Sequence, residues 1–165
     1  ARSTVEEVSG MPNAEAAAQA IADTGFDGCW IFAMGTNDTA NVAVGSTIGV
    51  DERIDRLMSV AGDNPAIWIN VRSLVPSGPY SEADMQKWDD ALLSACEKYP
   101  NMRVYDWASR VKDEWFIEDG IHFTSEGYVA RAKGIAKSVT EAFPPTAGLG
   151  GVWTPRTAPE SCVVK

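Results

Sequence analysis

The sequence predicts an α/β protein, a three-layer sandwich built around a mostly parallel sheet. Short apolar runs of strand length alternate with segments whose apolar residues recur at helical spacing. Residues 28–34 and 66–71 are apolar with little polar alternation, as expected for strands covered by helices on both faces. With 165 residues, of which 45% are hydrophobic, the chain is long enough for one domain with its own core. We expect this domain at residues 1–145, followed by a C-terminal tail at 146–165.

The first half of the chain is expected to contain two strands and two helices. Asn13 is placed to cap an alanine-rich helix that stops near Gly25. The next run, 28–34, is apolar throughout and predicts a central strand. A loop at 35–38 then leads to a helix with one apolar face that stops at Gly62. In order, the expected elements are a strand at 2–8, a helix at 13–25, a strand at 28–34 and a helix at about 51–61.

The second half is expected to add two strands and two helices. The dipeptide Asn64-Pro65 turns the chain into the strand at 66–71, and a loop rich in proline, glycine and serine ends where Ser81 opens a helix. A short strand at 102–105 precedes the last helix, which begins at Thr124 or Ser125 and is ended by Pro144 and Pro145. The residues expected to face the core are Met85, Trp88, Leu92, Cys96 and Tyr99 in the first of these helices and Tyr128, Ala132, Ile135, Val139 and Phe143 in the second.

Composition excludes several classes of protein. The formal net charge is −9, which argues against a broad phosphate-binding surface and so against a nucleic-acid partner. No segment approaches the roughly 18 consecutive apolar residues of a membrane span. The first residues show neither the basic nor the apolar region of an export signal, although a signal already removed would leave no trace.

The three cysteines, Cys29, Cys96 and Cys162, lack the short spacing of zinc ligands, so we expect no metal and no other cofactor. Cys29 lies in an apolar run and Cys96 on an apolar helical face, which favours small buried side chains over a redox role. Cys162 could form a disulfide in an oxidising compartment, and the sequence leaves this open.

The single histidine, His122, follows Asp119 by three residues in a predicted loop before the last helix. An aspartate at this spacing can accept from one ring nitrogen, which fixes the tautomer and leaves the other nitrogen free as a general base. The structural alternative is that Asp119 caps a turn and His122 packs beneath the helix.

A second group of polar residues, Gly35-Thr36-Asn37-Asp38, directly follows the strand expected at 28–34. Ligands of open α/β sheets bind beyond the carboxyl ends of the strands, so this loop lies where a site is expected. The Asn37 amide can donate a hydrogen bond to a developing oxyanion. Taken alone, the same composition is common in turns.

Together these two groups resemble the SGNH (GDSL-type) esterases and acyltransferases, whose third sequence block reads Gly-x-Asn-Asp and whose fifth reads Asp-x-x-His. Gly35 to Asp38 match the third block and Asp119 to His122 match the fifth, in the family's order. Gly10 falls where the glycine of the second block is expected. The resemblance covers about residues 2–143.

One family block is missing from this chain. The family's nucleophile is a serine in a Gly-Asp-Ser motif at the end of the first strand, and the 165 residues contain no Gly-Asp-Ser. By analogy, the segment that carries it also supplies the first, central strand of the sheet. We therefore expect an N-terminal segment present as a separate chain, or a strand supplied by a symmetry-related copy.

The resemblance implies acyl transfer through a serine ester. His122 would take the proton of that serine and Asp119 would orient His122, while Asn37 and the backbone N–H of Gly10 would stabilise the oxyanion. Asp38 would hold the shape of the loop that begins at Gly35. Three further residues are candidates for contacts with substrate: Arg72 for an anionic or sugar group, and Trp115 and Phe116 for an acyl pocket.

The family's substrates are largely small acyl esters, including acetylated sugars, and the acceptor is water in an esterase or a sugar hydroxyl in an acyltransferase. Sequence does not separate these two reactions. The main alternative is a non-catalytic SGNH-like domain that binds carbohydrate or acts as a scaffold. A generic flavodoxin-like binding domain is less favoured, because no glycine-rich phosphate loop follows a predicted strand. By analogy we expect an extracytoplasmic or secreted protein, with a cytoplasmic one left open.

Overall fold

The computed structural model describes residues 2–7, 10–144 and 161–165 and has an α/β fold. A sheet of four parallel strands runs in the order β1 (Trp30–Phe32), β2 (Ala66–Ile69), β3 (Met102–Tyr105) and β4 (Val163–Val164). Five helices flank it: α1 (Ala14–Ala22), α2 (Thr36–Ala43), α3 (Val50–Ala61), α4 (Glu82–Lys98) and α5 (Ser125–Ala142). The α/β prediction is therefore confirmed, and all described strand pairs are parallel.

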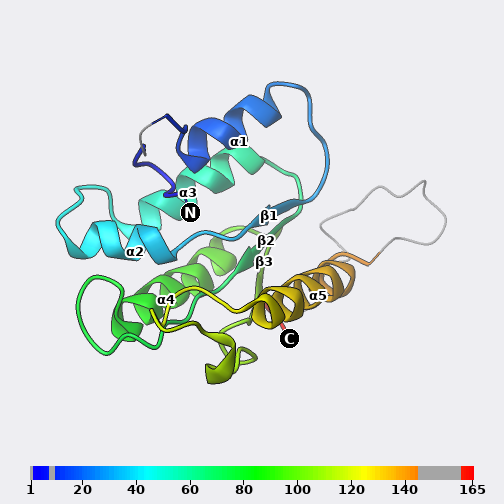
Figure 1. Cartoon of the computed structure of the whole chain (residues 1–165). Coiled ribbons are helices and arrows are strands. Elements are labelled where there is room, and N and C mark those ends of the chain that lie inside the picture. Colours follow the sequence, from blue (N-terminus) through cyan, green and yellow to red (C-terminus); the bar gives the residue numbers. More distant parts are fainter. Residues whose placement is uncertain (1, 8–9, 145–160) are drawn as a thin grey trace.

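Alternate residues of β2 point into two separate cores. Ala66 and Trp68 belong to a core shared with α1, α3 and α4, whereas Ile67 and Ile69 belong to a core shared with α5. All four side chains are fully buried, which explains why the run at 66–71 lacks polar alternation. Figure 1 shows α5 on the opposite side of the sheet from α3 and α4.

The apolar run at 28–34 forms only the three-residue strand β1, which lies at the edge of the described sheet and not at its centre. Trp30 and Phe32 are buried in the core on the α3 side, which explains why these two positions of the run are apolar. Ile31 points to the other face, beyond the reach of α5, and is 49% exposed. The strand expected at 2–8 is absent from residues 2–7, and Val8 lies outside the described residues.

The segment expected to be a loop at Gly35 to Asp38 is the start of α2. Gly35 precedes the helix with a φ of 129°, and a side chain there would meet the indole of Trp88 at 2.5 Å. Asp38 accepts a hydrogen bond from the backbone N–H of Gly35, which satisfies one of the unpaired donors at the helix start. Glycine and aspartate in this order therefore favour a helix start as well as a turn.

Helix α5 contacts the sheet through part of the predicted face and through small residues beside it. Ile135, Val139 and Phe143 pack against the core as predicted. Tyr128 is 47% exposed and Ala132 is also exposed, whereas Gly127, Ser138 and Ala142 are buried. A Cβ on Gly134 would lie 2.0 Å from the hydroxyl of Tyr105. Small residues thus allow close approach of the helix, and a pattern of large apolar residues does not detect such a face.

The expected tail at 146–165 is not loose at its end. Val163 and Val164 pair with β3 as the fourth strand, and Cys162 forms a disulfide with Cys96 in α4. Cys96 is buried as predicted but is also bonded. Residues 146–160 lie outside the described residues. The disulfide ties β4 to the helix layer, because the two cysteines come from distant parts of the chain.

None of the helices in the described part of the chain has the length and hydropathy of a membrane-spanning segment.

A buried arginine links α3 to the N-terminal residues. The Arg53 side chain is fully buried and lies 2.8 Å from Asp38, which is also fully buried. Its second partner is Glu6, and burial of these charges is tolerated because each is paired. Hydrogen bonds with Arg53 hold the pKa of Glu6 far below its usual range, against the opposing effect of partial burial.

We expect Arg53→Ala to lower the free energy of unfolding by about 3 kcal/mol or more, since Asp38 would be left buried without its partner. The matched control is Arg56→Ala in the same helix, because Arg56 pairs with Glu15 and Glu52 at the surface. Chemical denaturation of both variants measures the difference. Equal losses would show that the buried pair is not a major source of stability.

Candidate active site

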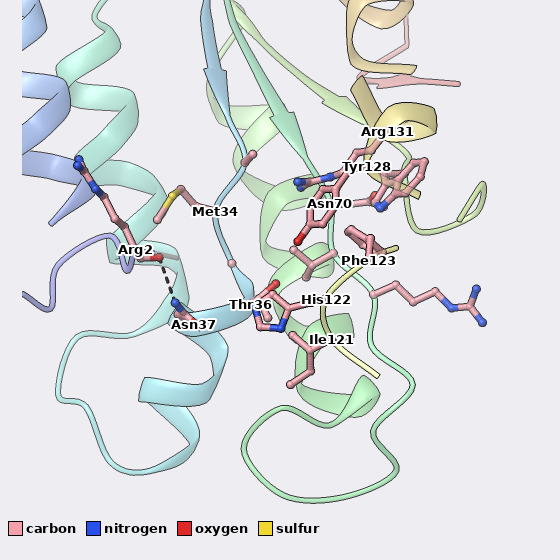
Figure 2. Close-up of a pocket in the computed structure, with 15 residues that line it drawn as sticks. Arg2, Met34, Thr36, Asn37, Asn70, Ile121, His122, Phe123, Tyr128 and Arg131 are labelled. Atoms are coloured by element: carbon pink, nitrogen blue, oxygen red, sulfur yellow. Dashed lines mark hydrogen bonds between the residues drawn. The ribbon is translucent and has the colours of Figure 1, made fainter. Parts of the chain in front are cut away.

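A cavity of about 170 Å³ lies at the carboxyl end of the sheet. Its walls are residues 33–37 after β1, residues 70–72 after β2, Trp107 after β3, and residues from His122 to Arg131 at the start of α5. Figure 2 shows Thr36, His122 and Ile121 in one part of this cavity and Tyr128 and Arg131 in another. Ligands of open α/β sheets bind at this edge, so the cavity is the candidate site.

His122 lies in this cavity with its ring fixed by Asp119. The Nδ1 atom of His122 is 2.7 Å from Oδ2 of Asp119, as the spacing of the two residues predicts. A carboxylate can only accept, so this contact places the ring hydrogen on Nδ1 and leaves Nε2 free to accept a proton. Both side chains are about half exposed, which leaves the ring accessible.

The Asp119 carboxylate is held by the backbone of its own loop. Its Oδ1 accepts hydrogen bonds from the backbone N–H groups of Ile121 and His122 at 2.8 and 2.9 Å. These two bonds, and then the contact with the His122 ring, lower the pKa of Asp119 to about 2. The group is therefore a stable anion that both closes the turn and orients His122.

The loop that carries His122 is closed by pairing with the chain on either side. Phe116 and Phe123 form an antiparallel bridge, and the N–H of Ile117 donates to the carbonyl of His122 at 2.9 Å. Gly120, with a φ of 68°, accepts from the N–H of Leu74 in the loop after β2. Hydrogen bonds within its own loop and from the loop after β2 therefore both fix the position of His122.

Asn37 lies in the first turn of α2 and lines the same cavity as His122. Its Nδ2 donates a long hydrogen bond, 3.5 Å, to the backbone carbonyl of Arg2, drawn as a dashed line in Figure 2. The amide group has a second N–H, so it can still donate to a ligand. The neighbouring Asp38 is turned away from the cavity and accepts from Ser3, Thr4, Gly35 and Arg53.

The other residues singled out in the sequence are divided between the cavity and its surroundings. Gly35 and Arg72 line it, and Arg72 is also bonded to Asp113 at 2.7 Å. Gly10, Trp115 and Phe116 are not among the residues that line it. Phe116 is buried in the α5 core, and Trp115 lines a separate groove beside α5. Neither aromatic side chain therefore lies where an acyl group would bind next to His122.

The cavity is also lined by Asn70, Tyr128 and Arg131, which were not expected there from the sequence. For Asn70 a signal was available, because it is a polar residue that directly follows an apolar strand. Its amide donates to Asp106 and accepts from the N–H of Ala108, so it joins the loops after β2 and β3. Tyr128 and Arg131 are three residues apart on α5, and only the orientation of the helix shows that they reach the cavity.

The described residues supply the cavity with acid–base and hydrogen-bonding groups but with no strong nucleophile. No serine or cysteine of the described residues lines it; the hydroxyl groups present are those of Thr36 and Tyr128. Cys29 lies elsewhere, and burial raises the pKa of its thiol to about 11. Within the described residues, no group of three or more histidine, cysteine, aspartate or glutamate side chains could hold a metal ion.

No protein-family model matches the chain, and no curated protein matches it in sequence.

A partly buried carboxylate supports the cavity wall from behind. Asp89 in α4 accepts a hydrogen bond of 3.0 Å from the backbone N–H of Val71, which lines the cavity. Burial raises the pKa of Asp89 to about 7, and the nearby charges of Glu82, Asp106 and Asp90 act in the same direction, against the bond from Val71. Because the neutral form is favoured in the folded state, the contribution of Asp89 to stability is present below about pH 4 and is lost as the pH rises from there to about 7.

We therefore expect Asp89→Asn to stabilise the protein relative to wild type at about pH 8, by about 2–4 kcal/mol, and by progressively less as the pH is lowered toward about 4. Asparagine keeps an acceptor for Val71 and removes the charge. Thermal or chemical unfolding across this pH range gives the difference, with the neighbouring exposed Asp90→Asn as control. A difference between Asp89→Asn and wild type that does not change with pH would contradict this account.

Proposed function

We propose that the cavity is the acid–base and oxyanion half of an acyl-transfer site of the SGNH type. The observation that carries this proposal is the presence of His122, oriented by Asp119, and of Asn37 in one cavity at the carboxyl end of a parallel sheet. The two sequence blocks that contain these residues are those by which the chain resembles that family.

The roles follow from the chemistry of each group. Nε2 of His122 takes the proton of an attacking hydroxyl and returns it to the leaving group, and Asp119 stabilises the imidazolium formed in between. The Asn37 amide donates to the oxygen that gains charge in the tetrahedral intermediate. Gly10 does not line the cavity, so no role in stabilising this oxyanion is proposed for it.

The nucleophile, in this proposal, is a serine that belongs to a further strand. In the described part of the sheet the outer edge of β1 has no partner, and Ile31 beside it is 49% exposed. In a parallel ladder, alternate residues direct their backbone N–H and C=O groups to opposite neighbouring strands. Ile31 lies between two residues bonded to β2, so its backbone offers a donor and an acceptor to a new strand on the outer edge of β1. A strand added here would end at the carboxyl end of β1, next to the cavity.

The substrates that suit this site are small acyl esters, such as acetyl esters of carbohydrates. A cavity of about 170 Å³ is close to the ~150 Å³ that holds a benzene molecule, so it accepts a short acyl group. The acceptor is water or a sugar hydroxyl. The Cys96–Cys162 disulfide supports an oxidising compartment and thus the proposed extracytoplasmic location.

A non-catalytic role is the second candidate, because no serine or cysteine of the described residues lines the cavity. In that case the same cavity binds a ligand, such as a carbohydrate, without covalent chemistry.

In the protein that includes the nucleophile, we expect His122→Ala and Asn37→Ala each to reduce hydrolysis of an aryl acetate by about 10²-fold or more. Both side chains are at least partly exposed, so the variants should fold, as circular dichroism can verify. Lys133→Gln, at an exposed site in α5, is the control. Rates near those of wild type for both cavity variants would exclude the assigned roles.

The second test asks where the nucleophile is. The purified protein is treated with a fluorophosphonate probe and its intact mass is measured before and after. We expect the adduct on a polypeptide other than the 17.8 kDa chain, or on a residue outside the sequence printed above. An adduct on the 165-residue chain itself would contradict the proposed second segment, and no adduct at all would favour the binding role.

A further inference from the structure

Arg131 in α5 is a cationic side chain that lines the candidate cavity, and none of the described residues forms an ion pair with it. Its Nε–H group is buried and donates to no hydrogen-bond acceptor among the described residues. No carboxylate of those residues forms an ion pair with it, although the chain has 23 acidic residues and a net charge of −9. Its guanidinium carbon instead lies 5.9 Å from the centre of the Phe123 ring.

The other two arginines that line the cavity differ from Arg131. Arg72 has its charge balanced by Asp113 at 2.7 Å and donates to the carbonyl of Val111 at 2.9 Å. Arg2 contributes its backbone carbonyl, and Figure 2 shows its side chain pointing away from the other labelled residues. The cavity therefore has one positive charge that is not balanced by the described residues, and this charge belongs to Arg131.

An unpaired guanidinium in a partly buried position is costly. Burial lowers the pKa of Arg131, as expected where the charged form is poorly solvated. Arginine nevertheless stays protonated in proteins, so the folded state carries the free-energy cost of an unpaired charge and an unpaired donor. A planar oxyanion can satisfy both at once through two parallel N–H···O bonds.

We propose that Arg131 is the anchor of a carboxylate-binding subsite, and that the substrate of this site carries a carboxylate near its ester group. One unbalanced positive charge matches a monoanion better than a phosphate dianion. The cavity has room for a small group of this kind beside His122. The statement about the substrate rests on the proposed function, whereas the binding of a carboxylate does not.

The test is a titration of the isotopically labelled chain with propionate and, in parallel, with neutral propionamide of nearly the same shape. Nuclear magnetic resonance shifts of the backbone amides of Phe123 and Tyr128 report on binding, at constant ionic strength with chloride as the replaced anion. We expect propionate to bind and propionamide to bind at least about tenfold more weakly. Arg131→Gln should weaken propionate binding about 10- to 100-fold, and Lys133→Gln, two residues away on α5, should leave it within about twofold.

Two results would overturn the proposal: equal binding of propionate and propionamide by wild type, or unchanged binding of propionate by Arg131→Gln. The second result would locate the carboxylate at His122 or Asn37, as for a reaction product. If Arg131→Gln does not fold, Arg131→Lys keeps the charge and removes the paired donors, so weaker propionate binding is still expected. Because this titration involves no covalent step, its outcome is independent of the fluorophosphonate result.

Discussion

The buried ion pair between Asp38 and Arg53 is the interaction on which the candidate site depends. Asp38 lies one residue after Asn37, and its carboxylate holds the start of α2 to α3 through Arg53 and to the N-terminal residues through Ser3 and Thr4. Two fully buried charges fix geometry strictly, since any displacement leaves a charge unpaired. The orientation of Asn37 toward the cavity follows from this constraint, as does the position of the Arg2 carbonyl beside it.

The sequence predicted the α/β class, three of the strands and the contact between Asp119 and His122, because these depend on local apolar runs and on a three-residue spacing. It did not predict which faces of the helices and strands pack against one another. The exposure of Ile31 depends on where α5 ends its cover of the sheet, and the closeness of α5 depends on Gly134 facing Tyr105. Strand β4 was missed because two valines in a proline-rich region carry no pattern of their own. Arg131 was missed because a single charged residue on a helix does not indicate that a cavity lies beside it.

Two features of the described residues that could accept a further partner lie close together. The carboxyl end of β1 has an unpaired outer edge, and the cavity beside it contains Asn37, His122 and the unpartnered Arg131. A stable protein usually pairs buried polar groups, so an unpaired strand edge and an arginine without an ion-pair partner beside a cavity suggest what could bind there. A strand with a nucleophile would satisfy the edge of β1, and a carboxylate-bearing ester would satisfy Arg131. Both proposals thus follow from the same physical rule, applied to backbone groups in one case and to a side chain in the other.

The proposed role of His122 requires one state of its ring, because only a ring with its hydrogen on Nδ1 leaves Nε2 free as a base. His122 is the single histidine of the chain, so the ¹⁵N signals of a histidine ring need no assignment. In the neutral ring we expect the hydrogen on Nδ1, held by Asp119, and its transfer to Nε2 in Asp119→Asn. A wild-type ring with its hydrogen on Nε2 would contradict the account, since Asp119 would then not prepare His122 for catalysis.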